Sequence, residues 1–323
     1  MRKATIIIGV ILTALTLSLT GQGTLAGAAV PVTFMLDWFP NPDHVPVYVA
    51  LQKGLFTQEG LQVRLQVPAD PNDPLKLVAA GKVDIAISYQ PTVTIARSQG
   101  LPVKSVGILI GQPLNTVMFL LDSGIRTPAD LKGKRIGYSV AGFEEALLSA
   151  VAASGGIKKG DYQLINIAFN LTPALLSRQV DAVVGAYRNF ERIQLELQGK
   201  KVGMFEVEKY GVPEYYELVV IASDRTVQRR PEILRRFIRA LSRGISQTLA
   251  NPEDALKTFF LANPKLKDEL NRRAFSATLP YFARTQVQSR ERWARFQDFL
   301  FAHGVIAKKS PVDELFTNAF VPR

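Results

Sequence analysis

The chain has 323 residues, of which 47% are hydrophobic and 21% charged, and its formal net charge is +11 at pH 7. This is the composition of a globular protein, long enough for two lobes. The lack of cysteine excludes disulfides, thiol catalysis and lipid attachment to cysteine, and the only two histidines are too far apart in sequence to suggest a zinc site. Because the basic residues are spread out and not interleaved with aromatic ones, we expect no nucleic-acid partner.

The first 28 residues have the pattern of a cleaved secretory signal. Arg2 and Lys3 precede an uncharged apolar run at residues 6–19, and residues 26–28 supply an A-x-A cleavage pattern. The run is shorter than the roughly 20 residues that a membrane span requires, although a retained anchor is the alternative. We predict cleavage after Ala28 and export to the periplasm.

Hydrophobic periodicity and turn residues predict alternating strands and helices in the first part of the chain. We expect strand 32–36, helix 44–53, strand 61–67, helix 74–80, strand 83–88, helix 90–99, and strands 103–110 and 115–121. Since helices join most of these strands, the pattern indicates a mostly parallel sheet covered on both faces.

A second unit of the same kind begins after residue 121, where Thr127, Pro128 and Gly133 mark a capped helical turn. We expect strand 134–138, helix 143–153, strand 163–167, helix 173–178, strand 181–185, a helix from about residue 188, and a closing segment at 201–207. Residues 77–87 and 175–184 echo each other, because each has a helix end, then Val-Asp, then an apolar strand.

The chain then returns to the first unit through strand 216–221 and ends in helices, expected at 231–249, 252–260, 270–282 and 288–301. Crossings near 115–121 and 216–223 would act as a hinge. We therefore predict an α/β fold of two lobes: 29–117 as the first part of lobe one, 118–214 as lobe two, and 215–323 as the return to lobe one.

The strand-to-helix connection at residues 36–44 is the segment most indicative of function. It brings a carboxylate (Asp37), an indole (Trp38), an amide (Asn41) and an imidazole (His44) to the end of a strand, where open α/β sheets bind small molecules. These groups favour a flat, polar ligand.

Motifs over nearly the whole mature chain resemble those of the thiamine-pyrimidine-synthase-like family of solute-binding proteins. They lie at residues 36–41 with His44, and at 53–56, 81–84, 130–137 and 185–191. The resemblance implies a type II periplasmic binding protein with two hinge strands, serving an ABC importer. It also implies a thiamine-pyrimidine precursor, hydroxymethylpyrimidine or a formyl-aminopyrimidine, as the solute and a membrane permease as the partner. We expect a monomer.

A fungal pyrimidine synthase of the same family and fold is also similar in the 36–44 loop. In the synthase, the segment that matches 88–92 carries a lysine for pyridoxal phosphate and a sacrificial histidine, but this chain has neither residue there and lacks the synthase's cysteines. With no G-x-S-x-G motif or phosphate loop, we predict a binding protein without cofactor or metal. The alternatives are another heteroaromatic, sulfonate or nitrate solute, or an exported enzyme on the same scaffold.

We expect lobe one to contact the ligand at six positions: Asp37, Trp38, Asn41, His44, Tyr89 and Gln90. The Trp38 indole offers a stacking face, and Asp37 can accept a hydrogen bond from an exocyclic amine. Structural alternatives stay open for each: core packing for the tryptophan, turn capping for the aspartate and asparagine, a loop carbonyl for the histidine, and an ordinary strand exit for the last two.

Lobe two and the hinge are expected to add seven positions: Gly142, Phe143, Glu144, Tyr187, Arg188, Glu191 and Tyr216. Gly142 would open a helix whose backbone N–H groups, with the Glu144 carboxylate, face the cleft. A helix would place Tyr187 and Glu191 on one face, four residues apart, with Glu191 as a second acceptor. For Arg188, a salt bridge is the open alternative.

Overall fold

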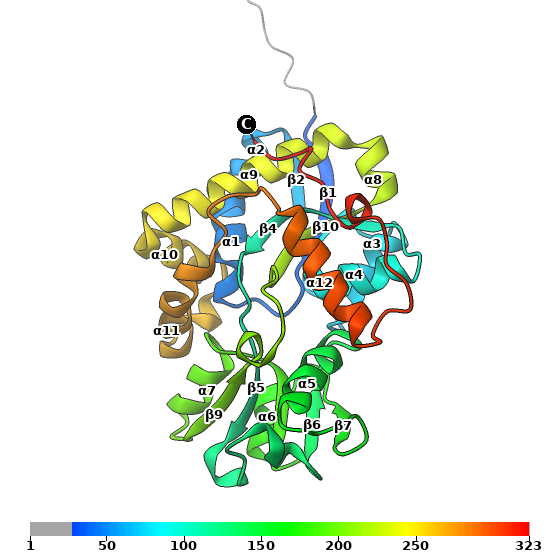
Figure 1. The fold of residues 1–323 in the computed structure, drawn as a ribbon. Coiled ribbons are helices and arrows are strands. Elements are labelled where there is room, and N and C mark those ends of the chain that lie inside the picture. Colours follow the sequence, from blue (N-terminus) through cyan, green and yellow to red (C-terminus); the bar gives the residue numbers. More distant parts are fainter. Residues whose placement is uncertain (1–27, 323) are drawn as a thin grey trace, which may run out of the picture.

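The computed structural model describes residues 28–322, which form two lobes, each built on a five-stranded sheet (Figure 1). The predicted signal segment, apart from Ala28, lies outside the described residues. Within the described part, no helix combines the length and the apolar character needed to cross a membrane.

The sheet of lobe one, in the upper half of Figure 1, has the strand order β2-β1-β3-β10-β4. Its strands are β1 (Val30–Met35), β2 (Leu61–Gln66), β3 (Ile85–Ser88), β4 (Val103–Ile110) and β10 (Leu218–Ser223). Four strands run in one direction, and β10, which returns from the other lobe, runs antiparallel to both neighbours. Strand direction is therefore mostly shared, as predicted, although β10 makes half of the pairings antiparallel.

Helices cover both faces of this sheet (Figure 1). They are α1 (Val45–Gln52), α2 (Leu55–Gln58), α3 (Asp73–Ala79), α4 (Gln90–Ser98), α8 (Asp224–Arg229), α9 (Pro231–Ala250), α10 (Pro252–Ala262), α11 (Glu269–Thr278), α12 (Arg290–Ala302) and α13 (Val312–Leu315). Gly244 lets α9 lie directly on α1, because a Cβ atom there would be 2.5 Å from the Pro46 carbonyl oxygen. The short helices α2, α8 and α13 were not predicted.

Lobe two repeats the arrangement with the strand order β7-β6-β8-β5-β9. Its elements are β5 (Asn115–Leu120), β6 (Arg135–Tyr138), β7 (Gln163–Asn166), β8 (Ala182–Tyr187), β9 (Val202–Glu206), α5 (Phe143–Ser154), α6 (Leu171–Leu176) and α7 (Glu191–Leu197). Here β5 is the strand that enters from the other lobe and runs antiparallel to both neighbours. The second sheet begins at Asn115, whereas the predicted lobe boundary follows residue 117.

One predicted helix starts later than expected. The sequence pattern suggested a helix from about residue 188, but β8 continues to Tyr187 and α7 begins at Glu191. The predicted helical face shared by Tyr187 and Glu191 is therefore wrong. The two residues are close for another reason: the Tyr187 backbone N–H donates to Glu191 Oε2 at 2.7 Å across the turn.

The two lobes contact each other directly. Asn189 of lobe two donates through Nδ2 to Asp43 Oδ1 and to Thr278 Oγ1 of lobe one, both at 2.7 Å. On the other side of the cleft, Asn72 Oδ1 accepts from the Ala141 backbone N–H at 3.1 Å. The structure is thus a closed arrangement in which side chains from both lobes can meet one ligand.

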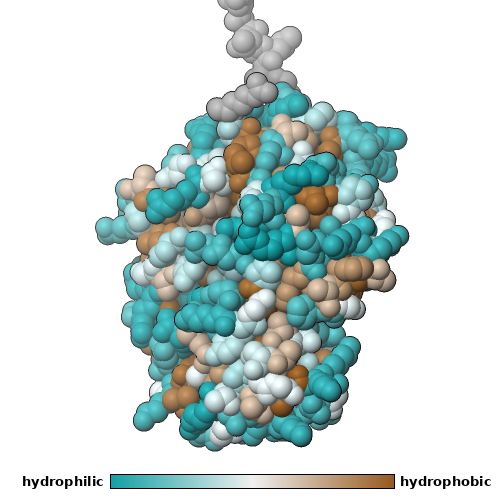
Figure 2. Space-filling model, viewed as in Figure 1, coloured by the Kyte–Doolittle hydropathy of each residue, from teal (hydrophilic) through white to brown (hydrophobic). Residues whose placement is uncertain are grey.

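The visible surface gives no single apolar face. On the side shown in Figure 2, hydrophobic residues are scattered among hydrophilic ones. Large exposed hydrophobic side chains lie on separate elements, among them Leu197 on α7, Leu261 on α10 and Phe301 on α12. Isolated residues of this kind are normal on protein surfaces and mark no interface by themselves.

Candidate ligand-binding site

A cavity lies between the lobes, where β1, β3 and β8 end. Eight of the predicted ligand-binding residues line it: Asp37, Trp38, Asn41, Tyr89, Phe143, Glu144, Tyr187 and Glu191. Five other lining residues were not predicted: Asp43, Asn115, Leu171, Gly185 and Phe190. The sequence contained a signal for two of these residues. Asp43 belongs to the same loop as the predicted residues, and a glycine inside a strand, such as Gly185, often marks a close backbone approach.

Asp37 is held by two neighbours at the wall of the cavity. Its Oδ1 accepts from His44 Nε2 at 2.9 Å, and its Oδ2 accepts from the Tyr89 hydroxyl at 3.0 Å. His44 Nδ1 accepts from the Asn41 backbone N–H, which assigns the ring proton to Nε2. His44 is fully buried and lies outside the cavity lining. It therefore orients Asp37, while each carboxylate oxygen keeps a lone pair for a ligand.

We expect His44→Ala to lower the free energy of unfolding by about 1–3 kcal/mol, because Asp37 Oδ1 loses its donor inside the protein. His44→Gln keeps a side-chain donor and should recover part of the loss. His303→Ala is the matched control, since His303 is exposed at the end of α12. Urea unfolding followed by circular dichroism measures all three, and equal stability of H44A and H303A would contradict the role given to His44.

Four carboxyl groups line the cavity: Asp37, Asp43, Glu144 and Glu191. Burial raises the pKa of Asp43 to about 6, that of Glu191 to about 7 and that of Glu144 to about 8. Among the described residues that line the cavity, there is no lysine or arginine. The site is therefore rich in acceptors and favours hydrogen-bond donors and positive charge.

Aromatic rings form the remaining walls. Trp38 meets Phe169 of lobe two edge to face, with ring centroids 4.5 Å apart, and packs on the apolar cluster of that lobe. Tyr89 and Phe143, one from each lobe, stack at 5.3 Å. Trp38 is therefore placed at the interface between the lobes, where an indole can both close the cleft and present a face to a flat molecule.

The other predicted residues lie outside the cavity lining. Gly142 is the N-cap of α5. Gln90 accepts from the Tyr216 backbone N–H at 2.8 Å and so supports the hinge. Arg188 points away, toward Glu206 at 3.2 Å and Glu208 at 2.7 Å, so the salt bridge left open by the sequence is the one observed.

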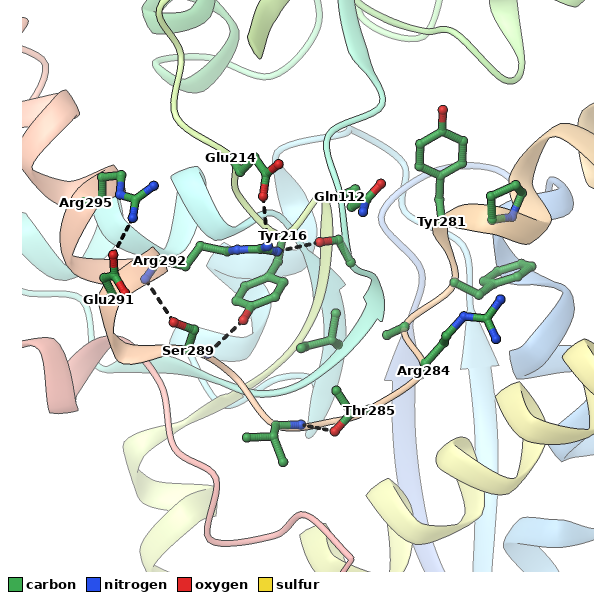
Figure 3. A pocket seen from close by; sticks show the side chains of 16 residues that line it. Gln112, Glu214, Tyr216, Tyr281, Arg284, Thr285, Ser289, Glu291, Arg292 and Arg295 are labelled. Carbon is green, nitrogen blue, oxygen red and sulfur yellow. Dashed lines mark hydrogen bonds and ion pairs between the residues drawn. The ribbon is translucent and has the colours of Figure 1, made fainter.

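Tyr216 faces a wider pocket on the other side of the hinge, shown in Figure 3. Arg292 lies over the Tyr216 ring at 4.6 Å and donates to the Gly111 carbonyl and to the Glu214 carboxylate. The pocket is lined by lobe one and the hinge, and its space of about 1100 Å³ is continuous with solvent. A site that senses closure needs contacts from both lobes, and the smaller cavity has them.

Glu217, the residue after Tyr216, joins the two crossings between the lobes. Its Oε2 accepts from the backbone N–H groups of Leu114 and Asn115 at 2.6 and 3.1 Å, and its Oε1 accepts from the Tyr187 hydroxyl at 3.2 Å. Burial raises the pKa of Glu217 to about 7. Glu217 was not predicted from the sequence. An acid directly before the apolar strand at 218–222 does, however, indicate a buried carboxyl group that needs hydrogen-bond partners.

Comparison with protein-family models gives a match to the family described as NMT1/THI5 like over residues 41–255. A thiamine biosynthesis protein of Haemophilus influenzae is 42% identical, covering 88% of this chain and 90% of that protein. The formylaminopyrimidine-binding protein of Halalkalibacterium halodurans is 36% identical and covers 89% of each chain. The 4-amino-5-hydroxymethyl-2-methylpyrimidine phosphate synthase of Legionella pneumophila is 31% identical, covering 90% of this chain and 92% of that protein.

Among solved structures, the alkanesulfonate-binding protein SsuA of Xanthomonas axonopodis pv. citri, bound to MOPS, is similar with a TM-score of 0.71. It is 18% identical and covers 90% of this chain and 98% of that chain. This likeness, together with the two sheets described above, confirms the predicted two-lobed binding-protein fold.

Proposed function

The chain belongs to the NMT1/THI5-like family, and we propose that it is the solute-binding component of an ABC importer for a thiamine-pyrimidine precursor. The observation that carries the proposal is the acceptor-rich cavity between the lobes, with its aromatic walls. The name of the Halalkalibacterium relative, a formylaminopyrimidine-binding protein, supports the same class of solute. The solute we propose is hydroxymethylpyrimidine or a formyl-aminopyrimidine.

An aminopyrimidine suits this cavity because it is flat and carries an exocyclic amine. Asp37 is already fixed by His44 and Tyr89, so its remaining lone pairs point in defined directions for an amine donor. Trp38 and Tyr187 reach the cavity from opposite lobes and offer ring faces to the heterocycle. We propose that the solute is enclosed between these rings, which couples binding to closure of the lobes.

The transport setting follows from the same proposal. We propose export with cleavage after Ala28, a monomer in the periplasm, and delivery of the solute to a membrane permease by the closed form. Lobe one would comprise residues 29–117 and 215–323, and lobe two residues 118–214. A neighbouring gene pair for a permease and an ATPase would support this assignment.

The relatives named as phosphate synthases make an enzyme the competing function. We propose binding without turnover, because the segment at residues 88–92 has neither lysine nor histidine. In this segment, the Tyr89 hydroxyl instead donates a hydrogen bond to Asp37. Product analysis after incubation with each pyrimidine tests this point, and any conversion would favour the enzyme.

A thermal-shift screen tests the solute. Hydroxymethylpyrimidine and formyl-aminopyrimidine should each raise the melting temperature, since a ligand at one hundred times its dissociation constant adds about 2.7 kcal/mol. Taurine, nitrate and riboflavin should leave it unchanged. No shift with either pyrimidine would reject the proposal.

Trp38→Ala should weaken pyrimidine binding by roughly 1–3 kcal/mol, the usual range for loss of a stacking aromatic ring. Trp38→Phe keeps an aromatic face and should lose less. Phe301→Ala, an exposed aromatic residue on α12, is the control and should bind as the parent does. Isothermal titration calorimetry measures the affinities. Unchanged affinity with lowered stability in W38A would assign Trp38 to packing between the lobes alone.

A further inference from the structure

The charge of the cavity wall is one-sided. Asp37, Asp43, Glu144 and Glu191 approach it from both lobes, and the described lining residues include no basic side chain to balance them. His44 donates to Asp37, is fully buried and does not line the cavity. Two arginines are adjacent in sequence to lining residues of lobe two, and both are paired elsewhere: Arg188 with Glu206 and Glu208, and Arg192 with Glu196.

Two backbone N–H groups that precede helices at the cavity are also occupied. Helix N-termini commonly hold phosphate through their free N–H groups, and α5 and α7 both begin at the cavity. At α5, Glu144 Oε2 accepts from the Ser139 backbone N–H at 2.6 Å. At α7, Glu191 Oε2 accepts from the Tyr187 backbone N–H at 2.7 Å. The protein's own carboxyl groups therefore occupy one backbone donor in the loop before α5 and one at the end of β8 before α7, and they bring an acid to the first turn of each helix.

We propose that this cavity selects its solute by charge: it binds a neutral or protonated aminopyrimidine alcohol and rejects the phosphate monoester of the same alcohol. The inference rests on the proposed function and adds the charge class of the solute. A phosphate monoester carries a charge of about −1.5 to −2 at pH 7. Inside the cavity it would face four acids, with no lysine or arginine among the described residues lining the wall.

Calorimetry at pH 7 with three ligands tests the inference: hydroxymethylpyrimidine, its phosphate monoester, and its uncharged acetate ester. The acetate ester adds bulk without charge, so it separates repulsion from steric exclusion. We expect the acetate ester to bind within about tenfold of the alcohol and the phosphate monoester to bind at least about a hundredfold more weakly, two powers of ten being near 2.7 kcal/mol.

Glu191→Gln and Asp43→Asn probe the cause through the ratio of the two affinities, alcohol over phosphate monoester, because both carboxyl groups line the cavity and their pKa values of about 7 and about 6 leave them partly or mostly ionised at pH 7. Each variant should lower this ratio at least threefold, even where affinity for the alcohol also falls. Glu253→Gln, at an exposed position on α10, is the control and should keep the parent ratio.

Three results would overturn the charge-selection proposal while the proposed function stands: similar affinity for alcohol and phosphate monoester, loss of both esters alike, or unchanged ratios in both cavity variants. Binding of neither hydroxymethylpyrimidine nor formyl-aminopyrimidine would instead reject the proposed function, and this inference with it.

Discussion

Gly185→Ala is expected to reduce the affinity for the pyrimidine at least a hundredfold. Gly185 lies inside β8 with φ +103°, and a Cβ atom there would be 2.5 Å from Glu144 Cδ, well inside van der Waals contact. The Glu144 carboxyl would have to swing away, which breaks its hydrogen bond from Ser139 and moves the carboxyl group into the space of the solute. Backbone strain at this φ should also lower the free energy of unfolding by about 1–3 kcal/mol.

Gly199→Ala supplies the matched control, because Gly199 also has positive φ, at +73°, but has nothing within 4 Å of an added Cβ. It should lose stability by about 1 kcal/mol and bind normally. Calorimetry with hydroxymethylpyrimidine and thermal unfolding of both variants give the comparison. If G185A bound as tightly as G199A, the packing of Glu144 on Gly185 would have no part in the site.

The order of strands and helices could be predicted because it depends on local patterns of hydrophobic periodicity and turn residues. The strand at Val103–Ile110 and the start of α9 at Pro231 agree with the prediction to the residue. The loop at residues 36–44 was also informative, since a polar run after a buried strand is a local signal. Its role as one wall of the cavity follows from the general position of binding sites at the ends of strands.

Partners that lie far apart in sequence could not be predicted. Asp43 is hydrogen-bonded to Thr278, 235 residues away, and this contact depends on how α11 packs beside the cleft. For Arg188 the sequence left a ligand contact and a salt bridge both open, because Glu206 and Glu208 reach it only after β9 pairs with β5. Likewise, β8 extends to Tyr187 because that residue pairs with Asn115 of β5, and this pairing overrides the local helical pattern.

Stability is expected to fall as pH rises from 5 to 9, the opposite of what paired surface carboxylates produce. Glu144, Glu191 and Glu217 have folded-state pKa values of about 8, 7 and 7, all raised mainly by burial from the ordinary glutamate value of 4.5. Between the unfolded-state pKa of 4.5 and the folded-state pKa of each group, the folded protein binds more protons than the unfolded chain. The free energy of unfolding therefore decreases as pH rises. The stabilising contribution is complete below about pH 4.5 and is lost as pH passes through 7–8.

The expected size is at least on the order of 5 kcal/mol, because the rise in the pKa of Glu144 from 4.5 to about 8 alone corresponds to nearly that much at about 1.4 kcal/mol per pKa unit. For a chain of this length the melting temperature should drop by roughly 10 °C. Acids with lowered pKa, such as Asp181 and Asp254, titrate below this window and leave the slope unchanged.

Glu217→Gln removes one titrating group and should flatten the profile of stability against pH, whereas the exposed Glu253→Gln should not. Differential scanning calorimetry from pH 5 to 9 measures the profile, and a melting temperature that stays constant or rises would show that these buried carboxyl groups are ionised throughout.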